Sequence, residues 1–511
     1  MLSKIKSCGL HGIEGYIIEV ETDISSGLPG FDIVGLADIA VKESKERVRA
    51  AIKNSGFQFP VKRITVNLAP ANLKKEGSAF DLPIALGILA ATGQIESDAL
   101  DKYMFIGELS LNGEIKPVKG MLPMAVCARE SEIESLVLPC GNADEAAVVK
   151  ELAIMPAKEL SEIIYHLNGD RPLERHTVDI DGMFSGKLDY EIDFADVKGQ
   201  ANVKRALEVA ASGGHNCLML GSPGCGKTMI AKRLPTILPA MTFEEALEVT
   251  KIHSIAGTLP PNTSLITTRP FRSPHHTISA ISLIGGGRYP KPGEISLSHY
   301  GVLFLDEVPE FGKDALEVMR QPLEDGTVTI SRVNACLSYP SKTTLIAAAN
   351  PCKCGNFLDS SKECTCTPKQ IHQYLGKLSG PLLDRIDIHI EVASVKYKDL
   401  DSTTAEERSC VIRERVNKAR RIQQDRYKGI KIYSNSQLQP SMIDKYCRLD
   451  PKGKELLRNA FDRLGLSARA HNRILKVSRT IADMDGSGDI KPSHLAEAIQ
   501  YRSLDRKFWR E

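Results

Sequence analysis

The sequence of 511 residues has few aromatic residues, no long apolar run and no excess of either charge. Only 5% of the residues are aromatic, but 42% are hydrophobic, which is enough for folded cores and excludes a disordered, collagen-like or coiled-coil chain. The longest apolar stretch, residues 82–91, is far shorter than a membrane span and contains Pro83 and Gly87. Because 66 basic residues balance 64 acidic ones, the chain has no long-range field for a polyanion, and any such site must be local.

The start of the chain, MLSKIKSCGLHGIEG, lacks the apolar core of a signal peptide, so we expect a cytoplasmic protein with no membrane partner. In that setting a cysteine cluster suggests a metal site more than disulfides. The spacing C-x-C-x9-C-x-C departs from the two residues that usually separate paired zinc ligands, so structural Zn2+ and a set of reduced thiols both stay open. The four cysteines of the cluster are Cys352, Cys354, Cys364 and Cys366.

The length predicts about three domains of mixed α/β class. Residues 1–167 read as an α+β N-terminal domain, with alternating strands near 16–22 and 64–68 and helices at 38–55 and 81–91. Residues 168–198, rich in Asp and Gly, read as a linker. In residues 199–395, apolar strands at 216–220, 301–306 and 343–350 alternate with helices, which predicts a parallel sheet covered on both faces. Residues 396–511 are helical by pattern.

The string GSPGCGKT fits the phosphate-binding pattern G-x-x-x-x-G-K-[ST], follows an apolar strand and opens a helix. This context predicts backbone N–H groups and a helix N-terminus that face the phosphates of ATP. Lys227 is expected to reach the outer phosphates, and Thr228 to ligate Mg2+. The predicted cofactor-binding residues are Gly221, Ser222, Pro223, Gly224, Cys225, Gly226, Lys227 and Thr228.

Acidic and amide side chains follow the next two predicted strands. Asp306 is expected to hold Mg2+ and Glu307 to polarise an attacking water. Asn350 ends the following strand and is expected to orient that water through its amide. Taken alone, an acidic pair at a strand end is usually a solvated cap and an Asn there is usually a turn former. The upstream phosphate motif favours the catalytic interpretation.

Longer strings resemble the YifB/ComM family of magnesium-chelatase-like AAA+ ATPases over nearly the whole chain. They are RPFRSPHHTIS (269–279), GEISLSHYGVLFLDE (293–307), RQPLEDG (320–326), AAANPCKCG (347–355), LSGPLLDRIDIHIEV (378–392) and SARAHNRILKVSRTIADMDG (467–486). The resemblance implies an AAA+ P-loop core with a helical lid, preceded by a Lon-protease-like domain of the ribosomal S5 domain 2 type. It also implies a homo-hexamer with ATP between neighbouring subunits, in which Arg385 is the arginine finger and Arg469 the sensor arginine of the lid. Sequence spacing alone would favour surface ion pairs for both arginines.

The resemblance further implies a DNA helicase that promotes branch migration during natural transformation. Two β-type runs flank residues 331–334, like the pore hairpin of related AAA+ proteins, with Arg332 near the tip as the expected contact to DNA phosphates. From the sequence alone, a hairpin that has only a packing role is about as well supported as one that contacts DNA. The helix 408–428 carries eight basic residues against two acidic ones, so an outer DNA contact and a solvated face both stay open.

Two rival functions and one false motif remain to be weighed. The first rival is the motor subunit of a metal chelatase, and the second is an ATP-dependent Lon-type protease. Alignment places Ala79 and Leu122 where that protease has its Ser and Lys, with Ser78 and Lys119 nearby, so we expect a proteolytically inert domain. Residues 483–494 imitate a calcium loop, but His494 stands where the bidentate Glu is needed. We therefore expect a helix-turn-helix corner in the lid.

Overall fold

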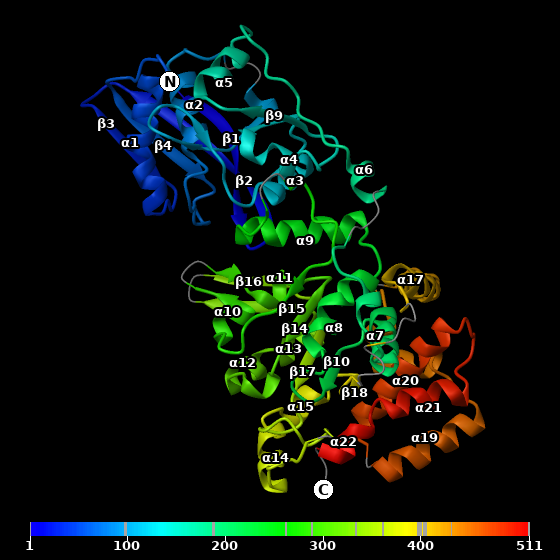
Figure 1. Cartoon of the computed structure of the whole chain (residues 1–511). Helices are drawn as coiled ribbons and strands as arrows, with labels where there is room; N and C mark the ends of the chain where they lie inside the picture. Colours follow the sequence, from blue (N-terminus) through cyan, green and yellow to red (C-terminus); the bar gives the residue numbers. More distant parts are fainter. Residues whose placement is uncertain are drawn as a thin grey trace. The chain divides into compact units, whose positions relative to one another are not determined.

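The computed structural model divides the chain into two compact units, which Figure 1 shows in sequence colours. It describes residues 2–96, 100–185, 190–260, 263–287, 290–332, 335–359, 362–395, 401, 406–430, 432–464 and 466–508. Unit 1 comprises Met1–Gly186 and Phe243–Thr267, and unit 2 comprises Lys187–Thr242 and Thr268–Glu511. Residues 243–267 therefore belong to unit 1, although they lie in sequence within the region predicted as the ATPase core. The four-part division of the sequence stays a prediction.

Unit 1 is built on a seven-stranded mixed sheet with the order β3-β4-β2-β1-β5-β8-β9. The pairs β1–β2 and β2–β4 are antiparallel, and the other neighbours are parallel. The predicted strand near residues 16–22 is confirmed within β2, where Ile18, Val20 and Thr22 are buried on one face. The strands are β1 Leu2–His11, β2 Glu14–Ser25, β3 Gly30–Val34, β4 Arg63–Ala69, β5 Tyr103–Phe105, β8 Ser135–Pro139 and β9 Ala153–Ala157.

Helices pack against this sheet, and the two predicted ones are confirmed. Helix α1 (Ile39–Asn54) begins after Asp38, whose carboxylate accepts the N–H of Val41 at 2.8 Å, as an N-cap does. Every residue of α2 (Asp81–Ala91) is buried. The other helices of unit 1 are α3 Met121–Glu130, α4 Ala143–Ala146, α5 Leu160–Leu167, α6 Ile180–Ser185 and α9 Phe243–Ala256.

Helix α9 is tied to unit 1 by a buried carboxylate. Glu145 on α4 accepts the backbone N–H of Leu122 at 2.9 Å, at the start of α3, and also accepts the hydroxyl of Ser254 on α9. The side-chain amide of Asn142 donates to the same carboxylate at 3.3 Å. One side chain thus joins α3, α4 and a helix from a distant part of the sequence.

Unit 2 contains the predicted parallel sheet, with the order β11-β14-β17-β10-β18. All of its described pairs are parallel. The strands are β10 Cys217–Leu220, β11 Phe271–Arg272, β14 Val302–Leu305, β17 Thr344–Ala349 and β18 Ile388–Glu391. Strand β17 lies between β10 and β14, so the carboxyl ends of these three strands meet at one edge of the sheet. That edge is where ligands bind in open α/β sheets.

Short elements surround the sheet of unit 2, including the hairpin that the sequence predicts. Strands β15 (Thr327–Arg332) and β16 (Ala335–Pro340) pair antiparallel, with Arg332 opposite Ala335 at the end of the pair. The helices are α7 Ala201–Gly213, α8 Lys227–Arg233, α10 Ala280–Ile284, α11 Glu294–Leu297, α12 Lys313–Val318, α13 Arg320–Asp325, α14 Pro368–Leu375 and α15 Gly380–Leu383.

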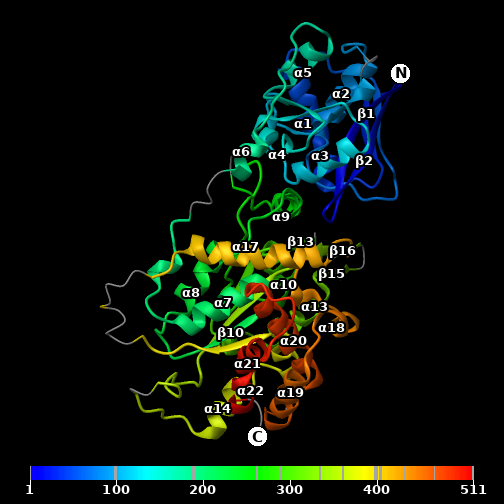
Figure 2. The ribbon, with the colours of Figure 1, turned by 90° about the vertical axis from the view of Figure 1, so that its right-hand side faces the viewer.

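The C-terminal part of unit 2 is helical, as its pattern predicts. The long helix α17 runs beside α7 and α20 (Figure 2). The predicted helix-turn-helix is present, because a short turn connects α20 to α21. Arg479 holds this turn by donating to the carbonyls of Ser487 and Gly488. The carboxylate of Asp483, near the end of α20, accepts hydrogen bonds from Arg426 and Arg479. The helices are α17 Ser409–Arg426, α18 Pro440–Tyr446, α19 Pro451–Leu464, α20 Ala468–Met484, α21 Pro492–Gln500 and α22 Ser503–Phe508.

Within the described parts of the chain, no helix has both the length and the apolar character that crossing a membrane requires.

Candidate functional site

The phosphate-binding loop joins β10 to α8 through backbone conformations that favour glycine. Gly224 and Gly226 have φ angles of 79° and 91°, in the left-handed region that side chains disfavour. Helix α8 begins at Lys227, directly after Gly226. The first N–H groups of this helix have no partner within it, and together with the loop they form a natural site for phosphate.

Lys227 is a buried cation held by neutral oxygens. Its ammonium donates to the carbonyls of Gly221 at 2.7 Å and Ser222 at 3.0 Å, and to the side-chain oxygen of Asn350 at 3.2 Å. Only 8% of Lys227 is exposed. A buried charge is stabilised by an opposite charge more than by neutral dipoles, so this environment fits an anionic phosphate. The hydrogen bond between Lys227 and Asn350 also brings together two residues that the sequence predicts for the same site.

Thr228 and Asp306 meet across the edge of the sheet. The hydroxyl of Thr228 donates to Oδ2 of Asp306 at 2.6 Å, and the other carboxylate oxygen accepts the N–H of Glu307 at 3.0 Å. A hydroxyl and a carboxylate side by side form the oxygen donor set that Mg2+ prefers, usually completed by waters and substrate phosphates. These residues therefore fit the magnesium ion that the sequence predicts.

Glu307 lies at the turn after β14 with φ of 50°, an unusual backbone conformation for a residue other than glycine. Its side chain is about half exposed, and Nδ1 of His276 lies 4.0 Å from its carboxylate. Such backbone strain is common at functional sites. His276 has no role that follows from the sequence alone, although it lies in the motif RPFRSPHHTIS.

The two predicted arginines contact their own chain. The guanidinium of Arg385 donates to the carbonyls of Arg320 at 2.9 Å and Pro381 at 2.8 Å, and pairs with Glu324. Arg469, which is 63% exposed, lies 3.6 Å from Asp384. Their roles as arginine finger and sensor therefore stay predictions.

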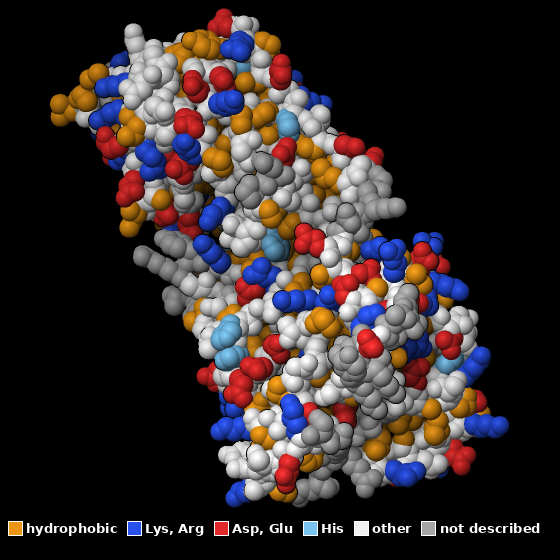
Figure 3. Space-filling view, in the orientation of Figure 1, with side chains coloured by type: hydrophobic (Ala, Val, Ile, Leu, Met, Phe, Trp, Pro, Cys, Tyr) orange, Lys and Arg blue, Asp and Glu red, His pale blue; other side chains and the backbone are white. Residues whose placement is uncertain are grey.

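The two candidate regions for contact with DNA are the hairpin β15–β16 and the basic helix α17. The backbone of Arg332 lies at the end of β15 as expected, while its side chain lies outside the described residues. On α17, Arg415 pairs with Glu208 and Glu407, and Arg426 pairs with Asp483. Part of the basic excess of this helix is therefore used in ion pairs within unit 2. On the face shown in Figure 3, acidic and basic side chains are interspersed rather than gathered by sign.

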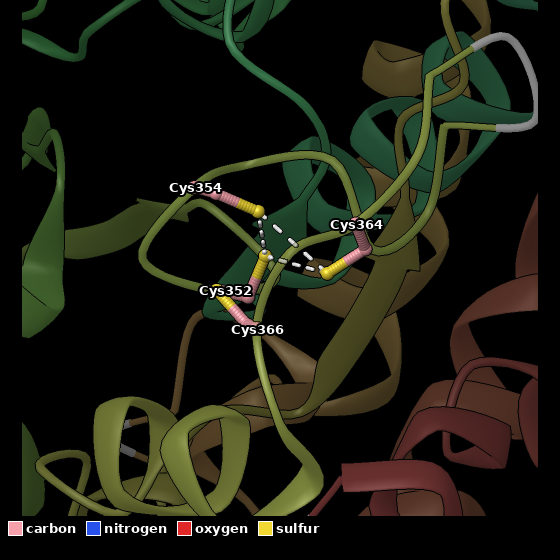
Figure 4. A group of neighbouring side chains, drawn as sticks. All are labelled: Cys352, Cys354, Cys364 and Cys366. Carbon is pink, nitrogen blue, oxygen red and sulfur yellow. Dashed lines mark hydrogen bonds between the residues drawn. The ribbon is translucent and has the colours of Figure 1, made fainter.

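The four clustered cysteines converge in the segment after β17. Their sulfurs all lie within 4.8 Å of one another. Figure 4 shows three sulfurs pointing together, with Cys352 3.3 Å from Cys354 and 3.7 Å from Cys364, and Cys354 3.6 Å from Cys364. Hydrogen bonds, of which the one from the backbone of Asn356 has the largest effect, lower the pKa of the Cys354 thiol to about 5. Burial raises the pKa of the neighbouring Cys352 thiol.

Unit 1 does not place a nucleophile and a base at the aligned positions of the Lon-type dyad. Ala79 and Leu122 are both buried and carry no reactive group. Nearby, the hydroxyl of Ser78 donates to Glu108, whereas Lys119 lies against Gly257. The proteolytically inert domain stays a prediction.

Comparisons with known proteins cover nearly the whole chain. Residues 193–400 match the family described as magnesium chelatase, subunit ChlI; residues 20–142 match subunit ChlI of Mg-chelatase; and residues 406–502 match the ChlI C-terminal family. The chain is 45% identical over 499 residues to competence protein ComM of Haemophilus influenzae, covering 97% of this chain and 96% of that protein. It is 42% identical over 506 residues to the uncharacterized protein YifB of Escherichia coli, covering 99% and 98%.

A weaker similarity involves a protease. The chain is 23% identical over 180 residues to Lon protease 2 of Bacillus subtilis, covering 32% of each protein. The partial match agrees with the predicted Lon-like fold class and extends over only a third of either chain.

Proposed function

Because the chain belongs to the YifB/ComM family of magnesium-chelatase-like AAA+ ATPases, we propose that it is a hexameric motor that moves along DNA and promotes branch migration of recombination intermediates. The relative from Haemophilus influenzae is named for competence, which supports a role in natural transformation. The family implies the use of ATP and Mg2+. The DNA substrate and the hexamer are the parts of the proposal that need direct tests.

The observation that carries the proposal is the convergence of Lys227, Thr228, Asp306 and Asn350 at the carboxyl edge of the parallel sheet. Lys227 would contact the outer phosphates, and Thr228 and Asp306 would hold magnesium. When bound, this ion neutralises charge that develops on the phosphates. The Lys227–Asn350 bond links the phosphate-binding lysine to the strand end that would orient the attacking water.

Glu307 is the residue proposed to polarise that water. It directly follows the magnesium-binding position, and its half-exposed carboxylate can be reached by solvent. The N–H of Glu307 is bonded to Asp306, so the main chain fixes the two acidic residues relative to each other. A positioned carboxylate of this kind acts as a general base.

Arg385 is proposed to act on ATP bound to the neighbouring subunit. Arg469 is proposed to act on ATP as the sensor arginine of the lid. A guanidinium supplied by a neighbouring subunit would stabilise the charge on the transferring phosphoryl group and link hydrolysis to assembly. The family similarity supports this role. Arg385 lies between α15 and β18, and its guanidinium donates to the carbonyl of Pro381 on α15.

The hairpin β15–β16 is the proposed DNA contact. Strands β15 and β16 pair antiparallel, and a cation at the end of β15 would be repeated around a ring. Contacts of this kind grip phosphates without reading bases, which suits movement along any sequence.

A strand-displacement assay tests the proposal. We expect the purified wild-type chain with Mg2+ and ATP to displace a strand from a labelled three-strand or four-way junction. Lys227→Ala should lose ATP turnover by at least about a hundredfold, because the phosphates lose their cation. Arg332→Ala should keep turnover and lose displacement.

Thr329→Ala, which removes a small exposed side chain from the same strand, is the matched control and should behave like wild type. Undiminished displacement by Arg332→Ala would exclude the hairpin from the mechanism. ATP hydrolysis without displacement by the wild type on every junction would contradict the DNA role.

A second candidate is the motor subunit of a metal chelatase, because all three matching families are described by subunit ChlI. This function requires a partner subunit that carries the metal-insertion site. Stimulation of ATP turnover by DNA alone would favour the DNA motor over this candidate. Cleavage of casein would instead revive the Lon-type protease, which Ala79 and Leu122 disfavour.

A further inference from the structure

The segment between β17 and α14 is long and has no regular secondary structure in its described parts, residues 350–359 and 362–367. Segments of this length without secondary structure are uncommon in compact domains, and those that occur are usually functional, disordered or linkers. This segment contains the four clustered cysteines and starts at Asn350, the residue that contacts Lys227. It is therefore connected directly to the nucleotide site.

The sulfur geometry fits one tetrahedral metal ion. Zinc–sulfur bonds of about 2.3 Å place the four sulfurs at the corners of a tetrahedron with edges of about 3.8 Å. The observed separations of 3.3, 3.6 and 3.7 Å among Cys352, Cys354 and Cys364 are close to such edges. A disulfide, by contrast, has an S–S distance of about 2.05 Å. Cys366 completes the set within 4.8 Å.

One side of the cysteine segment lies against the phosphate-binding loop. Gly355 has φ of 84°, and a Cβ built on it would lie 2.6 Å from Cγ of Pro223. Only a glycine therefore fits this close approach of two loops. Pro223 belongs to GSPGCGKT, so the position of the cysteine segment limits the conformations that the phosphate-binding loop can adopt.

The other side of the segment contacts the C-terminal helix. The rings of Phe357 and Phe508 make an edge-to-face contact with centroids 5.8 Å apart. Phe508 is buried and lies at the end of α22. The segment thus bridges the phosphate-binding loop and the helical C-terminal part of unit 2.

We propose that Cys352, Cys354, Cys364 and Cys366 bind one Zn2+ that fixes this segment against Pro223 and Phe508 and so preorganises the nucleotide site. Metal loading then controls the affinity for nucleotide without contributing to the chemistry. The inference rests on the nucleotide site and is independent of the proposed action on DNA.

The proposal has two parts, zinc binding and its effect on the nucleotide site. Measurements of zinc content and of nucleotide binding by the full chain test them separately. Inductively coupled plasma mass spectrometry should find about one zinc per chain in wild type and a large loss in the double variant Cys354→Ser/Cys364→Ser. Calorimetric titration with Mg-ADP should show about a tenfold weaker affinity for this variant if its competent loop conformation falls to about a tenth of the population. Cys410→Ser, which changes an exposed thiol on α17, should match wild type in both measurements.

Two single variants separate the metal from the coupling. Gly355→Ala should keep zinc but bind Mg-ADP more weakly, because its methyl group displaces Pro223. Lys227→Ala should keep zinc and lose Mg-ADP binding. If the cysteine variant fails to fold, zinc is removed from wild type with a zinc-selective chelator, and re-addition of ZnCl2 must restore Mg-ADP affinity.

Three results would overturn the inference. Wild type that contains no zinc and gives no tetrahedral thiolate spectrum with Co2+ would exclude the metal site. Iron bound in place of zinc would refute the assignment of the ion. Unchanged Mg-ADP affinity after loss of zinc would refute the coupling to the nucleotide site.

Discussion

At the residue scale, a buried carboxylate joins the sheet of unit 2 to its C-terminal helices. Asp387, which directly precedes β18, is bonded to Nδ1 of His215 at 3.1 Å and to the guanidinium of Arg473 on α20. The other ring nitrogen of His215 is 2.8 Å from the hydroxyl of Thr480. His215 lies two residues before β10, so this network supports the strand that leads into the phosphate-binding loop.

The pKa of Asp387 gives this network a pH dependence. Burial by itself raises the pKa, but the charge of Arg473 and the bonds with His215 outweigh it and hold the pKa below its ordinary value. A carboxyl group with a lowered folded pKa contributes stability that is present above its unfolded pKa of about 3.9 and is lost as the pH falls below it. We therefore expect the stabilising effect of Asp387 to disappear in acid.

Asp387→Asn tests this network. We expect the free energy of unfolding of unit 2 to fall by about 3–5 kcal/mol at neutral pH, because Arg473 is left without its buried partner. Chemical denaturation followed by circular dichroism measures the change. Glu134→Gln, which removes one half of the exposed pair with Lys102, should change stability by less than about 1 kcal/mol. An equally small effect of Asp387→Asn, or a difference from wild type that persists unchanged at pH 3, would contradict this account.

At the element scale, the sequence does not predict that helix α9 belongs to unit 1. The chain leaves unit 2 after Thr242, forms α9 in unit 1 and returns at Thr268. The hydrophobic pattern predicts local structure well, as α1, α2 and β10 show, but it does not reveal which surface a helix packs on. Glu145, which accepts a hydrogen bond from Ser254 on α9, lies 109 residues before it.

Glu145→Ala tests the attachment of α9. The variant leaves the N–H of Leu122, the amide of Asn142 and the hydroxyl of Ser254 without this acceptor. Each unsatisfied buried group costs about 1–3 kcal/mol, so we expect faster amide hydrogen exchange throughout residues 243–256. Mass spectrometry of exchanged peptides measures this. The control Glu130→Ala, at the exposed end of α3, should leave amide exchange in α9 at the wild-type rate. If exchange in α9 is also unchanged in Glu145→Ala, Glu145 does not anchor this helix.

At the scale of the whole molecule, local motifs proved more predictable than long-range partners. The parallel sheet, the P-loop context and the hairpin follow from short patterns, because hydrophobic period and glycine spacing act over a few residues. The ion pair of Arg415 with Glu208 joins residues 207 positions apart, and no spacing rule predicts it. For the same reason the charge pattern of α17 does not predict its ion pairs within unit 2, and a DNA contact of this helix stays a prediction.

The central claim is that ATP is hydrolysed between two copies of the chain and that the energy moves DNA. In such a ring, the site contains Lys227 of one subunit and Arg385 of its neighbour. Lys227→Ala and Arg385→Ala should each lose ATP turnover when pure. The Lys227→Ala subunit keeps Arg385, and the Arg385→Ala subunit keeps Lys227, so one of each can form an intact site. An equal mixture would then contain intact boundaries, at about a quarter of the positions if the subunits assemble at random in a ring of head-to-tail contacts.

The most direct measurement is therefore the ATP turnover of this mixture in the presence of junction DNA, compared with each variant alone. The account predicts turnover of about a quarter of the wild-type rate in the mixture, against almost none in either pure variant. Turnover in the mixture equal to the average of the two pure variants would contradict an ATP site shared between subunits.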